Sequence, residues 1–142
     1  MAPGHFLQPL LAANAPPAVL VVDGRPRPLA TAVEAAFDAP SRKRGLLGRT
    51  MLAVDTALII APCSAIHTFS MRFPIDVIFA ARDGRVLKIR HQMGASRVTM
   101  ARRAFAAIEM AGGEAQRHGL GVGDVLSLQP ASASLPPASA RR

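Results

Sequence analysis

The chain of 142 residues contains one cysteine, no tryptophan and no tyrosine. A single cysteine, Cys63, excludes an intrachain disulfide framework and fits either a reducing or an oxidising compartment. Phenylalanine is the only aromatic residue type, so the volume of a core must come from Leu, Ile, Val, Met and Ala. No stretch of the sequence approaches the roughly eighteen apolar residues of a membrane-spanning helix. These absences favour a globular domain with an aliphatic core.

Acidic residues are also scarce, because 9 Asp and Glu stand against 17 Lys and Arg, for a formal net charge of +8. Such an excess attracts any anionic partner at long range without identifying one. The basic stretch 97–103 has a single aromatic neighbour, Phe105, whereas proteins that read nucleic-acid bases stack them on aromatic side chains. Specific nucleic-acid binding is therefore not expected. Non-specific, salt-sensitive association through the basic surface stays as an alternative.

A cytoplasmic location is the default expectation. Residues 6–13 are mildly apolar and Ala-Asn-Ala at 13–15 resembles a signal-peptide cleavage site. However, no Lys or Arg precedes this run, Pro9 interrupts it, and Pro16 would follow the cleavage. Export to the periplasm is therefore the minority alternative.

The composition predicts one domain between two Pro-rich ends. Residues 1–17 are typical of a flexible arm, and residues 129–142 form a Pro/Ala/Ser tail that buries too little apolar surface to become ordered. Residues 18–128 contain short apolar runs separated by Gly, Pro and Asp. The basic, irregular segment 93–103 is expected to be a loop. The segment 104–110 fits either a strand or a helix, and Asp83-Gly84 predicts the turn of a β-hairpin. Strands are expected at 18–23, 29–37, 56–61, 75–82, 85–91 and 125–128.

Two short helices are expected within this domain. Asp38 is a favourable N-cap and Pro40 lies in a first turn, where a missing N–H costs little, so the first helix spans 39–47 and stops at Gly48. The second helix spans 114–118. The predicted fold class is therefore mainly β (α+β), a compact, mostly antiparallel, barrel-like or sandwich-like single domain.

A polar stretch interrupts the apolar pattern near the middle of the chain. HTFSMRFPIDVIF at 67–79 places His67, Arg72 and Asp76 among apolar residues. The alternation before Pro74 has a period of two, which predicts a strand. A carboxylate in such surroundings needs a partner, so we expect Asp76 to pair with Arg72 or Arg44.

Three blocks of the sequence occur in a characteristic order. They are RKRGLLGR at 42–49, HTFSMRFPIDVIF at 67–79 with ARDGRVL at 81–87, and AIEMAGGEAQRHGLGVGDVL at 107–126. Together they resemble the bacterial and archaeal family known as domain of unknown function 192. Ser70 stands where that family usually has Trp or Gly, and Ala111-Gly112 stands where it usually has Pro-Ala. The resemblance covers about residues 31–128 and implies a small, mainly β fold with no activity to transfer.

Cys63 and His67 are the candidates for catalysis. They lie four residues apart, and a thiolate activated by an imidazole is a nucleophile pair that Asp76 could orient. The same atoms with Glu109 could hold a metal ion. Alternatively, Cys63 is a small buried hydrophobe and His67 is hydrogen-bonded at a strand end. Paired Cys-x-x-Cys and two-His helix spacings are absent, so no metal and no cofactor is expected.

The block at 42–49 is the candidate for anion binding. Glycine N–H groups flanked by arginines can form an anion-binding concavity, although the spacing of a P-loop is absent. The alternative is a short helix with a solvated basic face and a glycine stop. The first hypothesis for the whole chain is thus a non-enzymatic binding or accessory domain with a small polar pocket for an anionic ligand or a partner segment. A small Cys/His-dependent hydrolase or transferase is the alternative. The residues expected at the pocket are Arg44, Arg49, His67, Phe69, Arg72, Asp76 and Glu109.

Overall fold

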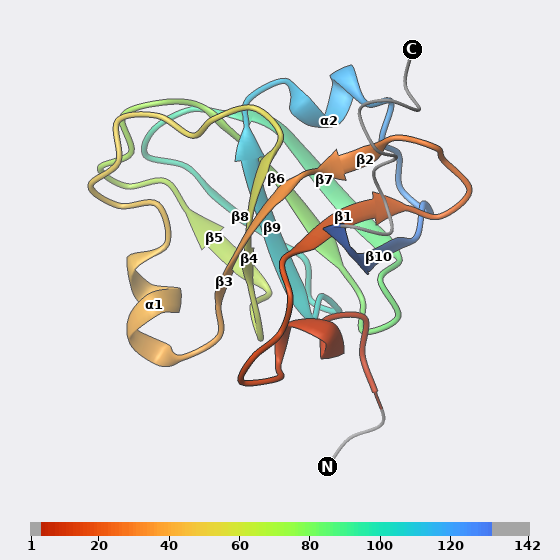
Figure 1. The fold of residues 1–142 in the computed structure, drawn as a ribbon. Helices are drawn as coiled ribbons and strands as arrows, with labels where there is room; N and C mark the ends of the chain where they lie inside the picture. The colour runs from red at the N-terminus through yellow and green to blue at the C-terminus, as the bar shows by residue number, and fades with distance from the viewer. Residues whose placement is uncertain (1–3, 132–142) are drawn as a thin grey trace.

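The computed structural model describes residues 4–131, and its strands form three sheets (Figure 1). The central sheet has the strand order β3-β4-β9-β6-β7, a second sheet has the order β10-β1-β2, and β5 pairs with β8 in a two-stranded ribbon. All pairings are antiparallel except the one between β3 and β4. The strands are β1 (Ala18–Val22), β2 (Pro28–Ala30), β3 (Ala32–Ala36), β4 (Thr56–Ile60), β5 (Ala65–His67), β6 (Ile75–Ala80), β7 (Val86–Met93), β8 (Val98–Met100), β9 (Ala106–Ala111) and β10 (Leu126–Pro130).

Helices are short in the described part of the chain. They are α1 (Ala39–Arg44), α2 (Glu114–Arg117) and the 3-10 turn η1 (Gln8–Leu10). None of these described helices has the length and apolarity that crossing a membrane requires. The mainly β class with two short helices is therefore confirmed. The three sheets are open, so the described residues form no closed barrel.

The two faces of the central sheet carry separate aliphatic clusters. Side chains alternate along each strand, so on β9 Ile108 joins one cluster and Ala107 joins the other. The sheet β10-β1-β2 closes the first cluster with residues such as Leu20. The second cluster is closed by Ile66 of the β5–β8 ribbon and by Leu46, which follows α1. Figure 1 shows β1, β2 and β10 on one side of the central strands and α1 and β5 on the other.

The first helix begins where the sequence predicts. The carboxylate of Asp38 accepts the N–H of Ser41 at 2.8 Å, as an N-cap should. The helix ends earlier than predicted, because Gly45 rather than Gly48 follows its last residue and takes a positive φ of 47°. Its basic residues therefore fall together in the last turn, directly before this glycine.

Two predicted strands are corrected by the structure. The segment 29–37 is not one strand but two, β2 and β3, in different sheets, because the N–H groups of Thr31 and Ala32 both turn to the carbonyl of Asp55. The alternating stretch after His67 is not a strand. The N–H of Met71 donates to Thr68 and closes a turn in which Ser70 has a φ of 67°, a conformation that favours glycine.

Two further segments form strands. For one of them the sequence fitted either a strand or a helix, and the other was expected to be a loop. Most of the segment 104–110 belongs to β9, the middle strand of the central sheet, and not to a helix. The basic segment 93–103 contains β8, which is held by its pairing with β5 and was expected to be a loop. Both strands gain their hydrogen bonds from partners distant in the sequence, which local periodicity does not reveal.

The ends of the described chain contact the domain. Leu7 is 1% exposed and belongs to the first aliphatic cluster, and the N–H of Phe6 donates to the carbonyl of Arg82 at 2.9 Å. Part of the expected flexible arm is therefore packed. At the other end β10 reaches Pro130, inside the expected tail. The rest of that tail, residues 132–142, lies outside the described residues.

Candidate functional site

The alternation of side chains on the central strands decides which acidic groups meet. Asp76 on β6 is in register with Met110, and Val77 is in register with Glu109. Met110 belongs to the first aliphatic cluster and Val77 to the second. Asp76 therefore lies on the face that α2 borders, and Glu109 lies on the face that α1 and the β5–β8 ribbon cover. The two acids that were expected in one pocket are on opposite faces of the sheet.

Asp76 is fully buried and its carboxylate is satisfied by the backbone. Oδ1 accepts the N–H groups of Gln92 at 2.8 Å and Gly113 at 3.0 Å, and Oδ2 accepts the N–H of Ala115 at 2.8 Å. These donors come from the end of β7 and the start of α2, so the carboxylate links β6 to both of these segments. The expected arginine partner is not among the donors described for this carboxylate. Asp76 is thus placed to stabilise the fold.

A cleft of about 310 Å³ lies between α1 and β5 on the other face. The last turn of α1 supplies one basic wall, and β5 with the residues before it supplies the opposite wall. Lys43, Arg44 and His67 are exposed, so the cleft has a cationic rim open to solvent. The polar side chains that line it are Arg42, Lys43, Arg44, Cys63, His67 and Glu109.

Glu109 is the unusual group of this cleft. Its side chain is 4% exposed, and its buried Oε1 has no hydrogen-bond partner among the described residues. Burial raises the pKa of this carboxyl group from 4.5 to about 7, and the positive charge of Arg49 opposes the rise. Arg49 does not satisfy the oxygen, because its guanidinium donates to Glu34 at 2.7 and 3.1 Å. Buried polar atoms without a partner are rare in folded proteins.

Gly45 leaves the space beside this carboxylate open. A Cβ atom at Gly45 would lie 3.6 Å from Oε1 of Glu109 and 3.9 Å from Cδ1 of Ile60. Any side chain at this position would therefore contact the carboxylate and narrow the cleft. The same glycine both ends α1 and leaves room for the cleft to reach the buried Glu109.

Cys63 and His67 line the same cleft, but their described contacts do not form a nucleophile pair. The thiol of Cys63 lies 3.2 Å from the carbonyl oxygen of Ala65 and donates to it. The imidazole of His67 stacks on Phe69, with ring centroids 5.0 Å apart. Burial raises the pKa of the Cys63 thiol, and the nearby Glu109 raises it further. Since the thiolate is the reactive form of cysteine, these surroundings do not favour catalysis.

The structure therefore brings together four of the residues singled out from the sequence, Arg44, Cys63, His67 and Glu109. The remaining four do not line the cleft. Phe69 stacks on His67 beside it, and Arg49 pairs with Glu34. Asp76 is on the opposite face of the sheet, and Arg72 is exposed without a described side-chain contact. Arg42 and Lys43 also line the cleft. They belong to the basic block at 42–49 that the sequence offered for anion binding, although they were not among the residues expected at the pocket.

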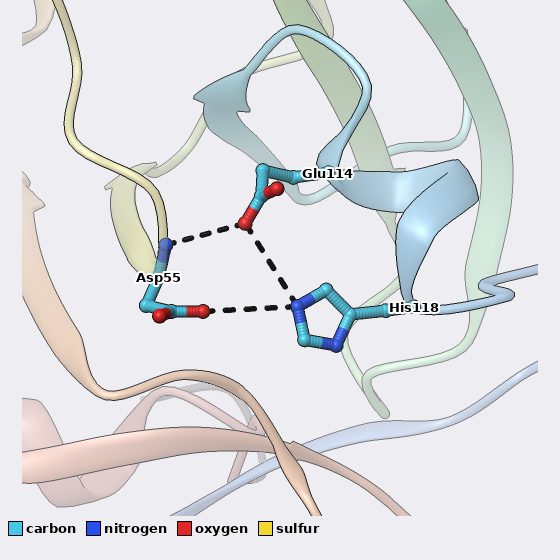
Figure 2. Close-up of side chains that lie close together, drawn as sticks. All are labelled: Asp55, Glu114 and His118. Carbon is cyan, nitrogen blue, oxygen red and sulfur yellow. Dashed lines mark hydrogen bonds and ion pairs between the residues drawn. The ribbon is translucent and has the colours of Figure 1, made fainter.

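A second polar cluster, which the sequence did not indicate, joins α2 to the loop before β4 (Figure 2). The ligand-type atoms of Asp55, Glu114 and His118 all lie within 4.8 Å of one another. However, Arg117 donates to Glu114 at 2.7 Å and to Asp55 at 3.0 Å, and its hydrogen bonds lower the pKa of Glu114. A cation at this cluster would have to displace the guanidinium. The cluster is therefore assigned to holding α2 against the sheet.

Comparisons with known proteins agree with the fold. The model of a family described as DUF192, "Uncharacterized ACR, COG1430", matches residues 19–128. A crystal structure of a protein of unknown function from Novosphingobium aromaticivorans is similar, with a TM-score of 0.69, 23% identity, and coverage of 81% of this chain and 88% of that one. A protein from Sinorhizobium meliloti, provisionally named as a transcription regulator, gives a TM-score of 0.68 and 23% identity over 83% of this chain and 93% of that one. No curated protein matches the chain significantly.

Proposed function

The chain belongs to the DUF192 family of uncharacterised proteins, and we propose that it is a non-enzymatic binding or accessory protein whose cleft between α1 and β5 takes a small anionic ligand. The observation that carries this proposal is the convergence of three cations from one helical turn on a single cleft. Catalysis is not part of the proposal, because burial raises the pKa of the only thiol in the cleft.

The cations of the rim are available to a ligand. Arg42 makes one long hydrogen bond, 3.4 Å to the carbonyl of Pro62. Within residues 4–131, Lys43 and Arg44 make no described side-chain hydrogen bond and no ion pair. Arginine and lysine bind carboxylate, sulfonate and phosphate groups through charge-assisted hydrogen bonds. Their side chains therefore offer an anion several donors at the mouth of a concave site.

The size of the cleft limits the ligand. A volume of about 310 Å³ is at the lower end of the range for small-molecule sites, about 300 to 1,000 Å³. It suits a metabolite-sized acid better than a nucleotide or a folded partner. A partner protein could still contribute an acidic side chain to it, which would use the same donors.

The proposal is tested by titrating inorganic phosphate and citrate at constant ionic strength into the wild-type protein and two variants. Arg44→Ala removes a cation of the rim, and Arg90→Ala removes an exposed cation of β7 that does not line the cleft. We expect Arg44→Ala to weaken binding about tenfold and Arg90→Ala to leave it unchanged. Equal effects of the two substitutions, or no binding by the wild type, would contradict the proposal.

A further inference from the structure

We propose that the ligand of the cleft carries an ammonium group as well as its anionic group, and that Glu109 receives the ammonium. The inference rests on the proposed function, because the anionic group is the part that the rim of α1 holds. It adds the chemical class of the ligand: a small amino acid or its sulfonate or phosphate analogue, with the two charges far enough apart to reach from α1 to β9.

The unpartnered oxygen of Glu109 is the first observation. Oε1 is buried, aimed at the space beside Gly45, and has no hydrogen-bond donor within residues 4–131. A buried acceptor without a donor is destabilised relative to the same group in water. A ligand that brings an N–H or O–H group to this oxygen removes that penalty, and binding thereby gains free energy.

Among the described residues, the surroundings of Glu109 supply no hydrogen-bond donor to Oε1. The charge of Arg49 partly opposes the rise in the pKa of Glu109, but its guanidinium donates its hydrogen bonds to Glu34. The thiol of Cys63 donates to Ala65. The remaining charged or titratable groups that line the cleft are Arg42, Lys43 and Arg44 on α1 and His67 on β5, and none has a described bond to this carboxylate.

Charge favours an ammonium over a neutral donor. A hydroxyl group would satisfy only the hydrogen bond, whereas an ammonium group satisfies the hydrogen bond and compensates the charge of a carboxylate that burial has desolvated. The anionic end of the same ligand then meets the cationic rim. The cleft, basic on the helix side and acidic at the sheet, is complementary to such a zwitterion.

The test uses matched sets of small acids that differ in one group. One set is β-alanine, 3-hydroxypropionate and propionate, a second is taurine, 2-hydroxyethanesulfonate and ethanesulfonate, and a third is 2-aminoethyl phosphate with ethyl phosphate. Dissociation constants are measured at about pH 8, where Glu109 is ionised because its pKa is about 7. In at least one set we expect the ammonium member to bind about tenfold more tightly than the others, as a charge-assisted hydrogen bond provides.

The substitution Glu109→Gln supplies the control. The amide keeps the shape of the side chain but not its charge, so the variant should lose the tenfold preference without any loss of affinity for the unsubstituted acid. In the wild type, lowering the pH to about 5.5 protonates Glu109 and should reduce the same preference, which gives a second measurement without a substitution. Because His67 and the rim act on all members of a set alike, the ratio within a set reports on Glu109.

The outcomes separate the two proposals. If ammonium and hydroxyl members bind equally, or if Glu109→Gln keeps the preference, the ammonium inference is overturned. If all members bind equally tightly and Arg44→Ala weakens all of them, the inference fails and anion binding stands. If no member of any set binds to the wild type, both proposals fail.

Discussion

The substitution Glu109→Gln should change how the stability of the protein depends on pH. Glu109 titrates near 7 in the folded protein and near 4.5 when unfolded, because burial disfavours its charged form. Between these two values the folded state binds more protons than the unfolded state, so the free energy of unfolding falls as the pH rises. This direction is opposite to that of a carboxylate stabilised by an ion pair.

The magnitude follows from the two pKa values. One pKa unit corresponds to about 1.4 kcal/mol, so ionising the buried carboxyl group costs the folded protein about 3 kcal/mol once the pH exceeds 7. Between about pH 5 and pH 8, the free energy of unfolding of the wild type should fall by roughly 2 to 3 kcal/mol relative to that of Glu109→Gln. In a domain of this size this equals roughly 10 °C in melting temperature.

Urea unfolding of both proteins at several pH values measures this difference. Glu34, Asp38 and Glu114 have lowered pKa values, from the hydrogen bonds of Arg49, the Ser41 backbone and Arg117 respectively. Their contributions are therefore lost below their unfolded pKa values, outside this window, and are common to both proteins. Parallel pH profiles for the wild type and the variant would refute the assignment of Glu109 as a buried, unpartnered acid.

Three further substitutions or reactions test the surroundings of the cleft. Asp76→Asn replaces an acceptor oxygen with an amide that faces backbone N–H donors, so it should lower the free energy of unfolding by about 2 to 4 kcal/mol; an unchanged urea midpoint would contradict this. At pH 8 the thiol of Cys63 should react with a thiol reagent at least about tenfold more slowly in the folded than in the urea-unfolded protein, because burial raises its pKa; equal rates would show that it is not shielded. Arg49→Ala should cost less than about 1 kcal/mol, because the side chains of its ion pair with Glu34 are 37% and 44% exposed; a larger loss would mean that Arg49 also stabilises ionised Glu109.

Features set by neighbouring residues could be predicted from the sequence. The Asp38 cap is local and lies where expected. So does the hairpin turn at Asp83-Gly84, where Gly84 has a φ of 92° between β6 and β7. The aliphatic runs of β1, β4 and β6 also gave the strands correctly, since burial on both faces leaves continuous apolar sequences.

Features set by distant pairing could not be predicted in the same way. The chain passes from one sheet to another between β2 and β3, where the N–H groups of Thr31 and Ala32 donate to the carbonyl of Asp55, which is far along the chain. The alternation after His67 reads as a strand, but the pairing of β5 with β8 ends at His67 and the N–H of Met71 then closes a turn on the carbonyl of Thr68. Most importantly, the side of the sheet on which an acid lies depends on register, and register separates Asp76 from Glu109. Once the register between β9 and β6 is known, the alternation of side chains along each strand places Asp76 on one face of the sheet and Glu109 on the other.

The central claim, that the cleft between α1 and β5 is the ligand site, is tested most directly by two-dimensional amide NMR. Isotope-labelled protein is titrated with inorganic phosphate, and with β-alanine, at constant ionic strength. The account predicts that the amide signals that move belong to residues 42–45 and 63–67, and that Arg44→Ala reduces these shifts. Shifts spread over the basic segment 97–103, or shifts that Arg44→Ala leaves unchanged, would contradict it.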